Sequence, residues 1–477
     1  MPPVLDRDSA VSREAAVPPP ADRFVRDRVW HRGRRGTVLV AGSPATFFRV
    51  TGTGATILDA LEADAVLPTG HEALTDRLVF TGAVHPVAGE PWSNVDLTVV
   101  VPVHRHRDDH ALEGLVTGLA PLRVLVVDDA SPVPVVLDDD GGRVSVLRLE
   151  VNVGPAAARN HGLAAIDTEA VTFVDADVVV DAATLARLAG HLRRERVVAA
   201  APRIRGLPGA GTVARHEERA CPLDMGPEPS WVRHSARVRY VPSACMVART
   251  DAIRGAGGFD ESMRTGEDVD LVWRLADAGH LVRFDPAFIA FHRARSTLRG
   301  ALAQRLGYGR SAAALARRHG SAVAPFRSNL VDAAALVALA AGAWIPGLIV
   351  LAGSFAGRIA RLLRLGAPLR AAVALTGSSA VALISHAAAA LVRTWFPLLV
   401  AGALLSTRAV PVALAALLVR ACAAVRTSGP TAAASAAFVL GPLGDLAYCA
   451  GVWRGTITAR SVRALLPVIT WRPGFGR

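Results

Sequence analysis

The sequence predicts an α/β protein built on a doubly wound, mostly parallel sheet. Short Val- and Leu-rich segments between residues 97 and 174 are typical of strands that are buried on both faces. Segments with apolar residues at helical spacing separate several of them, and polar residues follow their ends. Strands joined through helices favour a sheet whose ligand binds at the strands' carboxyl ends. We expect strands at 97–101, 124–127, 144–147 and 171–174, and helices at 108–119, 155–166 and 182–194.

Composition divides the 477-residue chain, which is 51% hydrophobic and carries a net charge of +12. Residues 301–477 hold 18 arginines and two acids, Asp332 and Asp445. Arginines that flank apolar segments suit an anionic membrane better than a nucleic acid, because duplex-binding proteins concentrate their charge on a folded polar face. We therefore expect a membrane partner and no nucleic acid. The four cysteines lie far apart without a C-x-x-C spacing, which argues against a zinc site and a disulfide framework.

The N-terminal part is predicted to be a tail followed by a small folded unit. Residues 1–20 are charged and Pro-rich, which predicts disorder, and they contain no apolar run typical of a secretion signal. Residues 21–90 predict a hairpin of segments 36–40 and 46–50, followed by two amphipathic helices. This layout resembles the winged-helix peptide-binding domains of the pyrroloquinoline quinone chaperone type, which carry precursor peptides to modifying enzymes. A folded spacer that packs on the next domain explains the pattern equally well.

Two carboxylates, Asp175 and Asp177, directly follow the fourth predicted strand. On an extended chain residues i and i+2 point to the same side, so the two side chains could share one ion. Oxygen ligands suit Mg²⁺ or Mn²⁺, and such an ion would neutralise a nucleotide diphosphate. An Asp-x-Asp pair is also common on solvated turns, so this prediction depends on the other motifs of the chain.

Further polar residues follow the first strands and begin the next helices. Asp129, after the second strand, could accept hydrogen bonds from a uracil imide or ribose hydroxyls, or could stabilise a turn. Arg159 lies one turn into a helix that begins at Pro155. From there it could reach a diphosphate or brace a carboxylate of the nucleotide site.

The segment Glu267-Asp268 is placed at the start of a later helix, where the helix dipole favours an ionised carboxylate. Asp268 could therefore act as a base toward an acceptor hydroxyl, although a helix cap has the same spacing. His292, at the end of a late strand, is either a metal-side ligand or a structural histidine.

In this order, the motifs resemble those of the family 2 glycosyltransferases of the GT-A fold, over the segment 95–300. The resemblance implies an inverting transfer from a nucleotide-sugar donor, with Asp268 as catalytic base beside Glu267. It places Asp175, Asp177 and His292 at a divalent metal, Mg²⁺ or Mn²⁺. It places the donor against Pro102, Val103, His104, Asp129, Arg159 and Asp175. The Gln-x-x-Arg-Trp motif of processive polysaccharide synthases does not occur after Asp268, so extrusion of a long polymer is not expected.

The C-terminal third predicts a basic amphipathic connector at 301–330, a hydrophobic helical membrane region at 331–455 and a basic tail at 456–477. The apolar spans, each close to the length of a bilayer crossing, are expected near 331–354, 371–392, 395–425 and 431–453. The third span could divide into two helices around Pro411. Arginines lie on both sides of the first span, so the positive-inside rule assigns both of its ends to the cytosol and gives no orientation across the membrane. Helical hairpins that enter the membrane from the cytosol would resolve this conflict. A soluble helical bundle is the alternative.

Taken together, the three parts resemble the glycosyltransferases of mycofactocin systems. This resemblance implies transfer of glucose from UDP-glucose onto a peptide-derived redox cofactor, as a β-1,4-linked oligosaccharide. The catalytic domain would lie on the cytoplasmic side of the cell membrane. Two alternatives stay open: a membrane-associated family 2 enzyme that acts on a lipid or cell-envelope acceptor, and a nucleotide-sugar-binding scaffold without turnover.

Overall fold

The computed structural model describes residues 23–33, 36–68, 70, 72–87, 92, 95–104, 110–138, 141–428 and 433–471. The predicted tail at 1–20 and the last six residues of the predicted basic tail lie outside these ranges.

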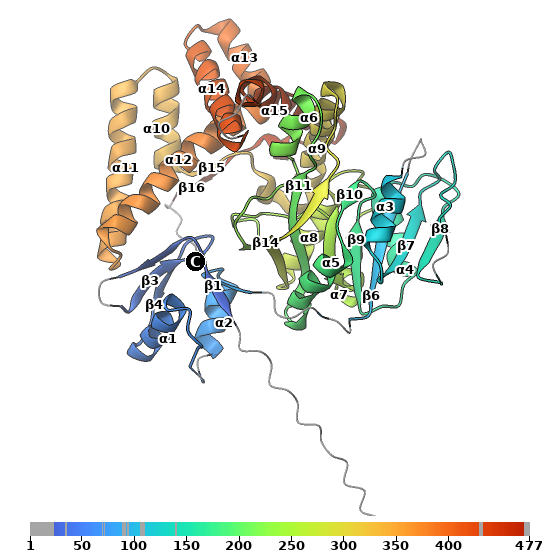
Figure 1. The fold of residues 1–477 in the computed structure, drawn as a ribbon. Coiled ribbons are helices and arrows are strands. Elements are labelled where there is room, and N and C mark those ends of the chain that lie inside the picture. The colour runs from blue at the N-terminus through green and yellow to red at the C-terminus, as the bar shows by residue number, and fades with distance from the viewer. Residues whose placement is uncertain are drawn as a thin grey trace, which may run out of the picture.

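A mixed sheet of nine strands forms the centre of the described chain (Figure 1). Its strand order is β10-β14-β11-β13-β9-β6-β7-β8, and β12 pairs with β14. The four predicted strands are confirmed and lie parallel to one another. They are β6 (Leu97–Val103), β7 (Arg123–Asp128), β8 (Val144–Arg148) and β9 (Ala170–Val174).

The other half of the sheet mixes directions, which the sequence did not predict. Strand β13 lies antiparallel to β9 and β11, whereas β11 and β14 are parallel. The short strands β10 and β12 lie antiparallel to β14. The bounds are β10 (Val178–Val179), β11 (Val197–Gly206), β12 (Ser230–Trp231), β13 (Cys245–Arg249) and β14 (Leu281–His292).

Strand β6 shows why the sheet needs helices on both faces, because alternate residues enter different cores. Val99 and Val101 pack in one core with the leucines of α3 (Ala111–Gly118) and α5 (Ala182–Ala189). Val100 packs in a second core with α4 (Pro155–Ala164) and α8 (Glu267–Asp277). Since all three valines are fully buried, the sheet is doubly wound as predicted.

The N-terminal unit contains the predicted hairpin and both helices. Strands β2, β3 and β4 form an antiparallel sheet, and β1 pairs with β5. The bounds are β1 (Phe24–Arg26), β2 (Trp30–Arg32), β3 (Val38–Ala41), β4 (Thr46–Arg49), α1 (Gly52–Glu62), α2 (Glu72–Phe80) and β5 (Val84–Pro86).

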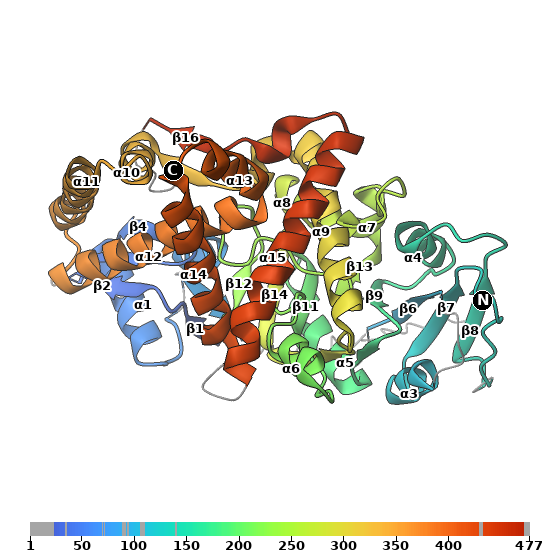
Figure 2. The same cartoon turned by 90° about the horizontal axis from the view of Figure 1, so that it is seen from above.

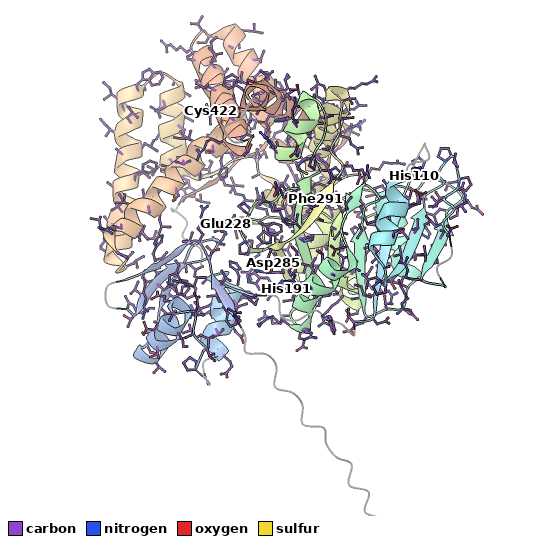
Figure 3. The ribbon with its side chains drawn as sticks, viewed as in Figure 1. His110, His191, Glu228, Asp285, Phe291 and Cys422 are labelled. Atoms are coloured by element: carbon purple, nitrogen blue, oxygen red, sulfur yellow. The ribbon has the colours of Figure 1, made fainter. Side chains whose placement is uncertain are left out.

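A buried polar network joins this unit to the nine-stranded sheet. Asp27 accepts hydrogen bonds of 3.1 Å from His85 and from Arg237. Arg283 of β14 donates to Nδ1 of His85 over 2.8 Å. Burial lowers the pKa of His85, and the neutral ring can therefore accept on one nitrogen and donate on the other. Next to this network lie His191 and Asp285, also 2.8 Å apart (Figure 3).

Seven helices make up most of the C-terminal part. Their bounds are α9 (Leu298–His319), α10 (Leu330–Ala340), α11 (Trp344–Arg364), α12 (Leu369–Arg393), α13 (Phe396–Leu405), α14 (Ala409–Ser428) and α15 (Ala433–Thr458). Within the described residues, four helical stretches are long and apolar enough to cross a membrane: 344–364, 369–393, 409–427 and 434–458.

Two predicted spans need correction. The first, 331–354, was wrong as a single helix, because the chain turns between α10 and α11, where Gly342 has a φ of +85°. The third, 395–425, does divide, but the break lies at residues 406–408 rather than at Pro411. Pro411 occupies the first turn of α14, where the missing N–H of a proline costs no helical hydrogen bond.

Helices α9 and α15 lie side by side and are in contact through their backbones (Figure 2). A Cβ atom on Gly309 of α9 would overlap the carbonyl oxygen of Tyr448, and one on Gly451 would overlap that of Leu306. Glycine is therefore required where helix α9, which follows the nine-stranded sheet in the chain, crosses the apolar helix α15.

We expect Gly309→Ala to destabilise the protein by about 1–3 kcal/mol, because an added methyl group forces two packed backbones apart. Gly307→Ala is the matched control, since its Cβ would meet nothing within 4 Å. That change should be neutral or stabilising by up to about 1 kcal/mol, the difference in helix propensity. Thermal unfolding of the full chain in detergent measures both effects, and equal stability of the two variants would contradict the close packing.

Candidate active site

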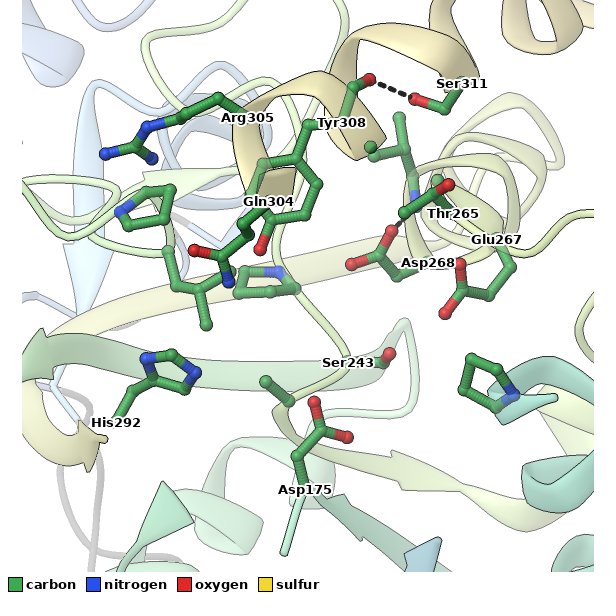
Figure 4. Close-up of a pocket in the computed structure, with 18 of the residues that line it drawn as sticks. Asp175, Ser243, Thr265, Glu267, Asp268, His292, Gln304, Arg305, Tyr308 and Ser311 are labelled. Atoms are coloured by element: carbon green, nitrogen blue, oxygen red, sulfur yellow. Dashed lines mark hydrogen bonds between the residues drawn. The ribbon is translucent and has the colours of Figure 1, made fainter. Parts of the chain in front are cut away.

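A cavity of about 1450 Å³ lies at the carboxyl ends of the parallel strands. Residues of β6, α4, α8 and α9 line it together with residues of α14 and α15. Figure 4 shows Gln304 and Tyr308 of α9 above Asp175, with His292 on the left and Asp268 on the right of the view. All the site residues predicted from the sequence lie on this one surface: Pro102, Val103, His104, Asp129, Arg159, Asp175, Asp177, Glu267, Asp268 and His292.

Asp129 is fixed at the end of β7 by the loop that precedes α4. Its carboxylate accepts from the backbone N–H groups of Val153 at 2.7 Å and Gly154 at 2.9 Å, and from the Asn152 side chain at 3.1 Å. His104, after β6, donates to the backbone oxygen of Asp129 over 2.8 Å. A carboxylate has about four acceptor sites, so Asp129 keeps roughly one for a ligand.

Arg159 connects the two acidic sides of the cavity. Its guanidinium donates to Asp175 at 2.6 Å and to Glu267 at 2.8 Å, while the side chain is buried and stacks 5.4 Å from the ring centre of Phe259. Of the two roles predicted for Arg159, this geometry fits bracing of the site carboxylates and leaves little of the guanidinium for a diphosphate.

The extended-strand geometry predicted for Asp175 and Asp177 was wrong. Strand β9 ends at Val174, and the next residues form a turn in which Val178 N–H donates to the carbonyl of Asp175. As a result Asp175 pairs with Arg159, whereas Asp177 faces His292 with 3.4 Å between Oδ2 and Nε2. Among the described residues, no group of three or more His, Cys, Asp and Glu side chains is arranged to hold a metal ion.

The pair of Asp177 and His292 nevertheless suits a cation. Burial alone would lower the pKa of His292, but its hydrogen bond and charge attraction to Asp177 raise that pKa to about 10. A proton on the ring thus supplies the positive charge that Asp177 attracts, and a divalent ion could take its place. Mg²⁺ commonly uses one or two protein ligands and completes its shell with water and phosphate oxygens.

Asp268 lies at the N-terminus of α8. The helix begins after Gly266, whose φ is +81° and whose Cβ would come within 2.8 Å of Ser311 on α9. The helix dipole alone predicts that a carboxylate at this position is readily ionised. In the folded protein, burial and the neighbouring Glu267 outweigh it and raise the pKa of Asp268 to about 7. Glu267 accepts a hydrogen bond from Arg159, and Asp268 beside it lines the cavity.

Several cavity residues were missed by the sequence analysis. All three tyrosines of the chain, Tyr240, Tyr308 and Tyr448, line the cavity. So do Arg393, Arg420 and Asp445 from the apolar helices. The three charged residues carried a usable signal, because ionisable side chains in apolar helices usually have a function. The tyrosines did not, since they are scattered along the chain.

Comparison with known proteins agrees with this site. Residues 98–249 match the family model described as glycosyl transferase family 2. The pre-mycofactocin glycosyltransferase of Mycobacterium tuberculosis is 38% identical over 456 residues, which cover 91% of this chain and 95% of that protein. The chain belongs to the pre-mycofactocin glycosyltransferase family. It is accordingly a family 2 glycosyltransferase with a GT-A fold, as its strand-end motifs predicted.

Among solved structures, the chain is similar to the mannosyltransferase PcManGT from Pyrobaculum calidifontis in complex with GDP-Man and Mn²⁺. The identity is 19% and the TM-score 0.36, with 62% of this chain and 83% of that chain covered. It is also similar to residues 1–349 of S. aureus TarS, at 20% identity and a TM-score of 0.32, with 44% and 64% covered.

We expect Arg159→Met to destabilise the protein by about 3–5 kcal/mol, because it leaves the partly buried carboxylates of Asp175 and Glu267 unpaired. Arg159→Lys should fall between this variant and the wild type, since an ammonium cannot bridge both acids as a planar guanidinium does. Chemical denaturation is the measurement, with Arg205→Met, at an exposed position of β11, as control. Wild-type stability of Arg159→Met would contradict the bridging role.

Proposed function

We propose that this protein is an inverting, metal-assisted hexosyltransferase that uses UDP-glucose. Its acceptor would be the peptide-derived redox cofactor mycofactocin or its precursor, on which it builds a β-1,4-linked oligosaccharide. One observation carries the proposal: Asp268, with its raised pKa, faces the same cavity as the Asp177 and His292 pair at the sheet edge. A base for an acceptor and a cation site for a donor diphosphate thus lie on opposite sides of one space.

In the proposed reaction an acceptor hydroxyl attacks the anomeric carbon of the sugar. The new bond forms as the bond from that carbon to the diphosphate oxygen breaks, and the hydroxyl proton passes to Asp268. A divalent ion held by Asp177 and His292 would neutralise the departing diphosphate. Arg293 and Arg295, which also line the cavity beside Asp177, would add to that charge stabilisation. Asp129 would hold the nucleoside by accepting one hydrogen bond.

The acceptor assignment is supported by the similarity to the M. tuberculosis protein, which covers 91% of this chain. We further propose that this unit binds the peptide part of the acceptor and that the catalytic domain lies on the cytoplasmic side of the cell membrane. In this arrangement the candidate membrane helices hold the cavity at the membrane surface.

A second acceptor class is favoured by one observation, namely that α14 and α15 line the same cavity as Asp268. A lipid or cell-envelope acceptor could approach the base along these apolar helices. The purified enzyme with labelled UDP-glucose decides between the classes: we expect label on a peptide-derived mycofactocin precursor and none on extracted membrane lipids. Label on the lipids alone would contradict the proposed acceptor and show that the acceptor is a lipid.

The same assay tests the cation. We expect a chelator to lower transfer by at least about 100-fold, since the cation carries much of the charge stabilisation of the leaving group. Added Mg²⁺ or Mn²⁺ should restore transfer in the wild type but not in Asp177→Ala. Asp181→Ala, which removes an N-cap of α5 away from the cavity, is the control for general damage. Undiminished transfer in chelator would refute the metal site.

The pH dependence of kcat/KM tests the base. A base with a pKa of about 7 is protonated, and inactive, at lower pH. We therefore expect kcat/KM to fall about tenfold per pH unit below 7 and to level off above it. Asp268→Asn should lower the rate by about 10²–10⁴-fold and abolish this pH dependence. A wild-type profile that stays flat down to pH 5 would contradict the assignment.

A further inference from the structure

Part of the cavity is not needed for the donor. Pockets that hold a drug-sized ligand have volumes of about 300–1,000 Å³, so 1450 Å³ leaves room for a second molecule. The additional wall comes from α9, α12, α14 and α15. It therefore lies between the catalytic domain and the apolar helices.

This wall carries a charged and aromatic cluster from three different helices. Asp445 of α15 lies 2.6 Å from Arg420 of α14 and 3.4 Å from Arg393 of α12. The guanidinium of Arg393 also stacks 4.2 Å from the ring centre of Tyr448. The side chain of Arg393 is 39% exposed, so much of it faces the cavity. Buried ion pairs contribute little to stability on balance, and such a cluster in apolar helices therefore points to a ligand.

The composition of the cluster selects the kind of ligand. Asp445, whose two oxygens each contact one guanidinium group, offsets part of the attraction of the two arginines for a phosphate or carboxylate. A hydrocarbon would offer no partner to the remaining donors of these guanidinium groups. A sugar ring suits all of them: its hydroxyls donate to a carboxylate and accept from guanidinium groups, and its apolar face packs on an aromatic ring.

Two tyrosines connect this cluster to the catalytic base. Tyr240 interacts electrostatically with both Asp268 and Arg393, and Tyr308 of α9 with Asp268. Burial raises the pKa of Tyr240 to about 12, so its hydroxyl keeps its proton and can donate a hydrogen bond at neutral pH. Tyr240 and Tyr308 line the same cavity as the base and the cluster and add hydrogen-bonding groups to its wall.

We propose that Arg393, Arg420, Asp445 and Tyr448 form an acceptor subsite that binds a sugar unit already attached to the acceptor. The enzyme could then take its own product as the next acceptor, with the bound unit held beyond the base. This inference rests on the proposed glycosyl transfer, and it assigns the helices a role in substrate binding besides membrane contact.

Binding of cellobiose, a β-1,4-linked glucose disaccharide, tests the subsite in the full chain in detergent with UDP bound. We expect Tyr448→Leu and Arg420→Gln each to weaken binding by about tenfold, as the loss of a ring contact or of one or two hydrogen bonds implies. Tyr448→Phe, which keeps the ring, should stay close to the wild type. The matched control is Arg408→Gln, at an exposed arginine between α13 and α14 outside the cavity.

UDP affinity and the unfolding temperature show whether each variant is folded. If Arg420→Gln does not fold, Arg420→Lys, which retains the charge, is tested in its place. We expect it to bind cellobiose more weakly than the wild type. Equal cellobiose affinity of all variants, no binding by the wild type, or displacement of cellobiose by inorganic phosphate would each overturn the subsite. Hydrolysis of UDP-glucose by the wild type is measured separately, because its absence would count against the proposed function rather than against the subsite.

Discussion

The active site depends on the contact of one guanidinium with two carboxylates. Arg159 lies on α4, Asp175 in the turn after β9, and Glu267 at the start of α8, more than a hundred residues from Arg159. Without the arginine, two acids would face one another in a partly dry space, where like charges repel strongly. The contact instead holds the sheet edge and the α8 terminus at a fixed separation. It also occupies Glu267, whereas Asp268, with its raised pKa, lines the cavity.

The apolar helices contribute residues to the wall of this site. Backbone contact between α9 and α15 is close enough to require glycine on both helices. Through it, residues of α14 and α15 reach the same cavity as the strand-end carboxylates. The N-terminal unit is attached just as firmly, through the network of Asp27, His85 and Arg283. The N-terminal unit, the catalytic domain and the apolar helices therefore pack against one another.

Strands β6 to β9 and the position of the polar site could be predicted from the sequence. Strand β6 is recognisable because every residue from Val99 to Val101 must be apolar when both faces are covered. Because parallel strands end at the same edge, Asp129 and Asp175 had to converge. Each of these conclusions follows from local patterns in combination with one general rule of sheet geometry.

The contacts of the polar site residues could not be predicted from the sequence, because they depend on how distant elements pack. Whether Asp175 joins Asp177 or Arg159 depends on a turn after β9, which strand periodicity cannot show. The pKa of Asp268 depends on burial, which the helix-dipole argument left out. Tyr240, Tyr308 and Tyr448 are separated by 68 and 140 residues, so no local pattern links them, and they meet because α9 and α15 pack against the open end of the sheet. Contacts between distant segments are set by the packing of whole elements, and the sequence of any one element does not contain them.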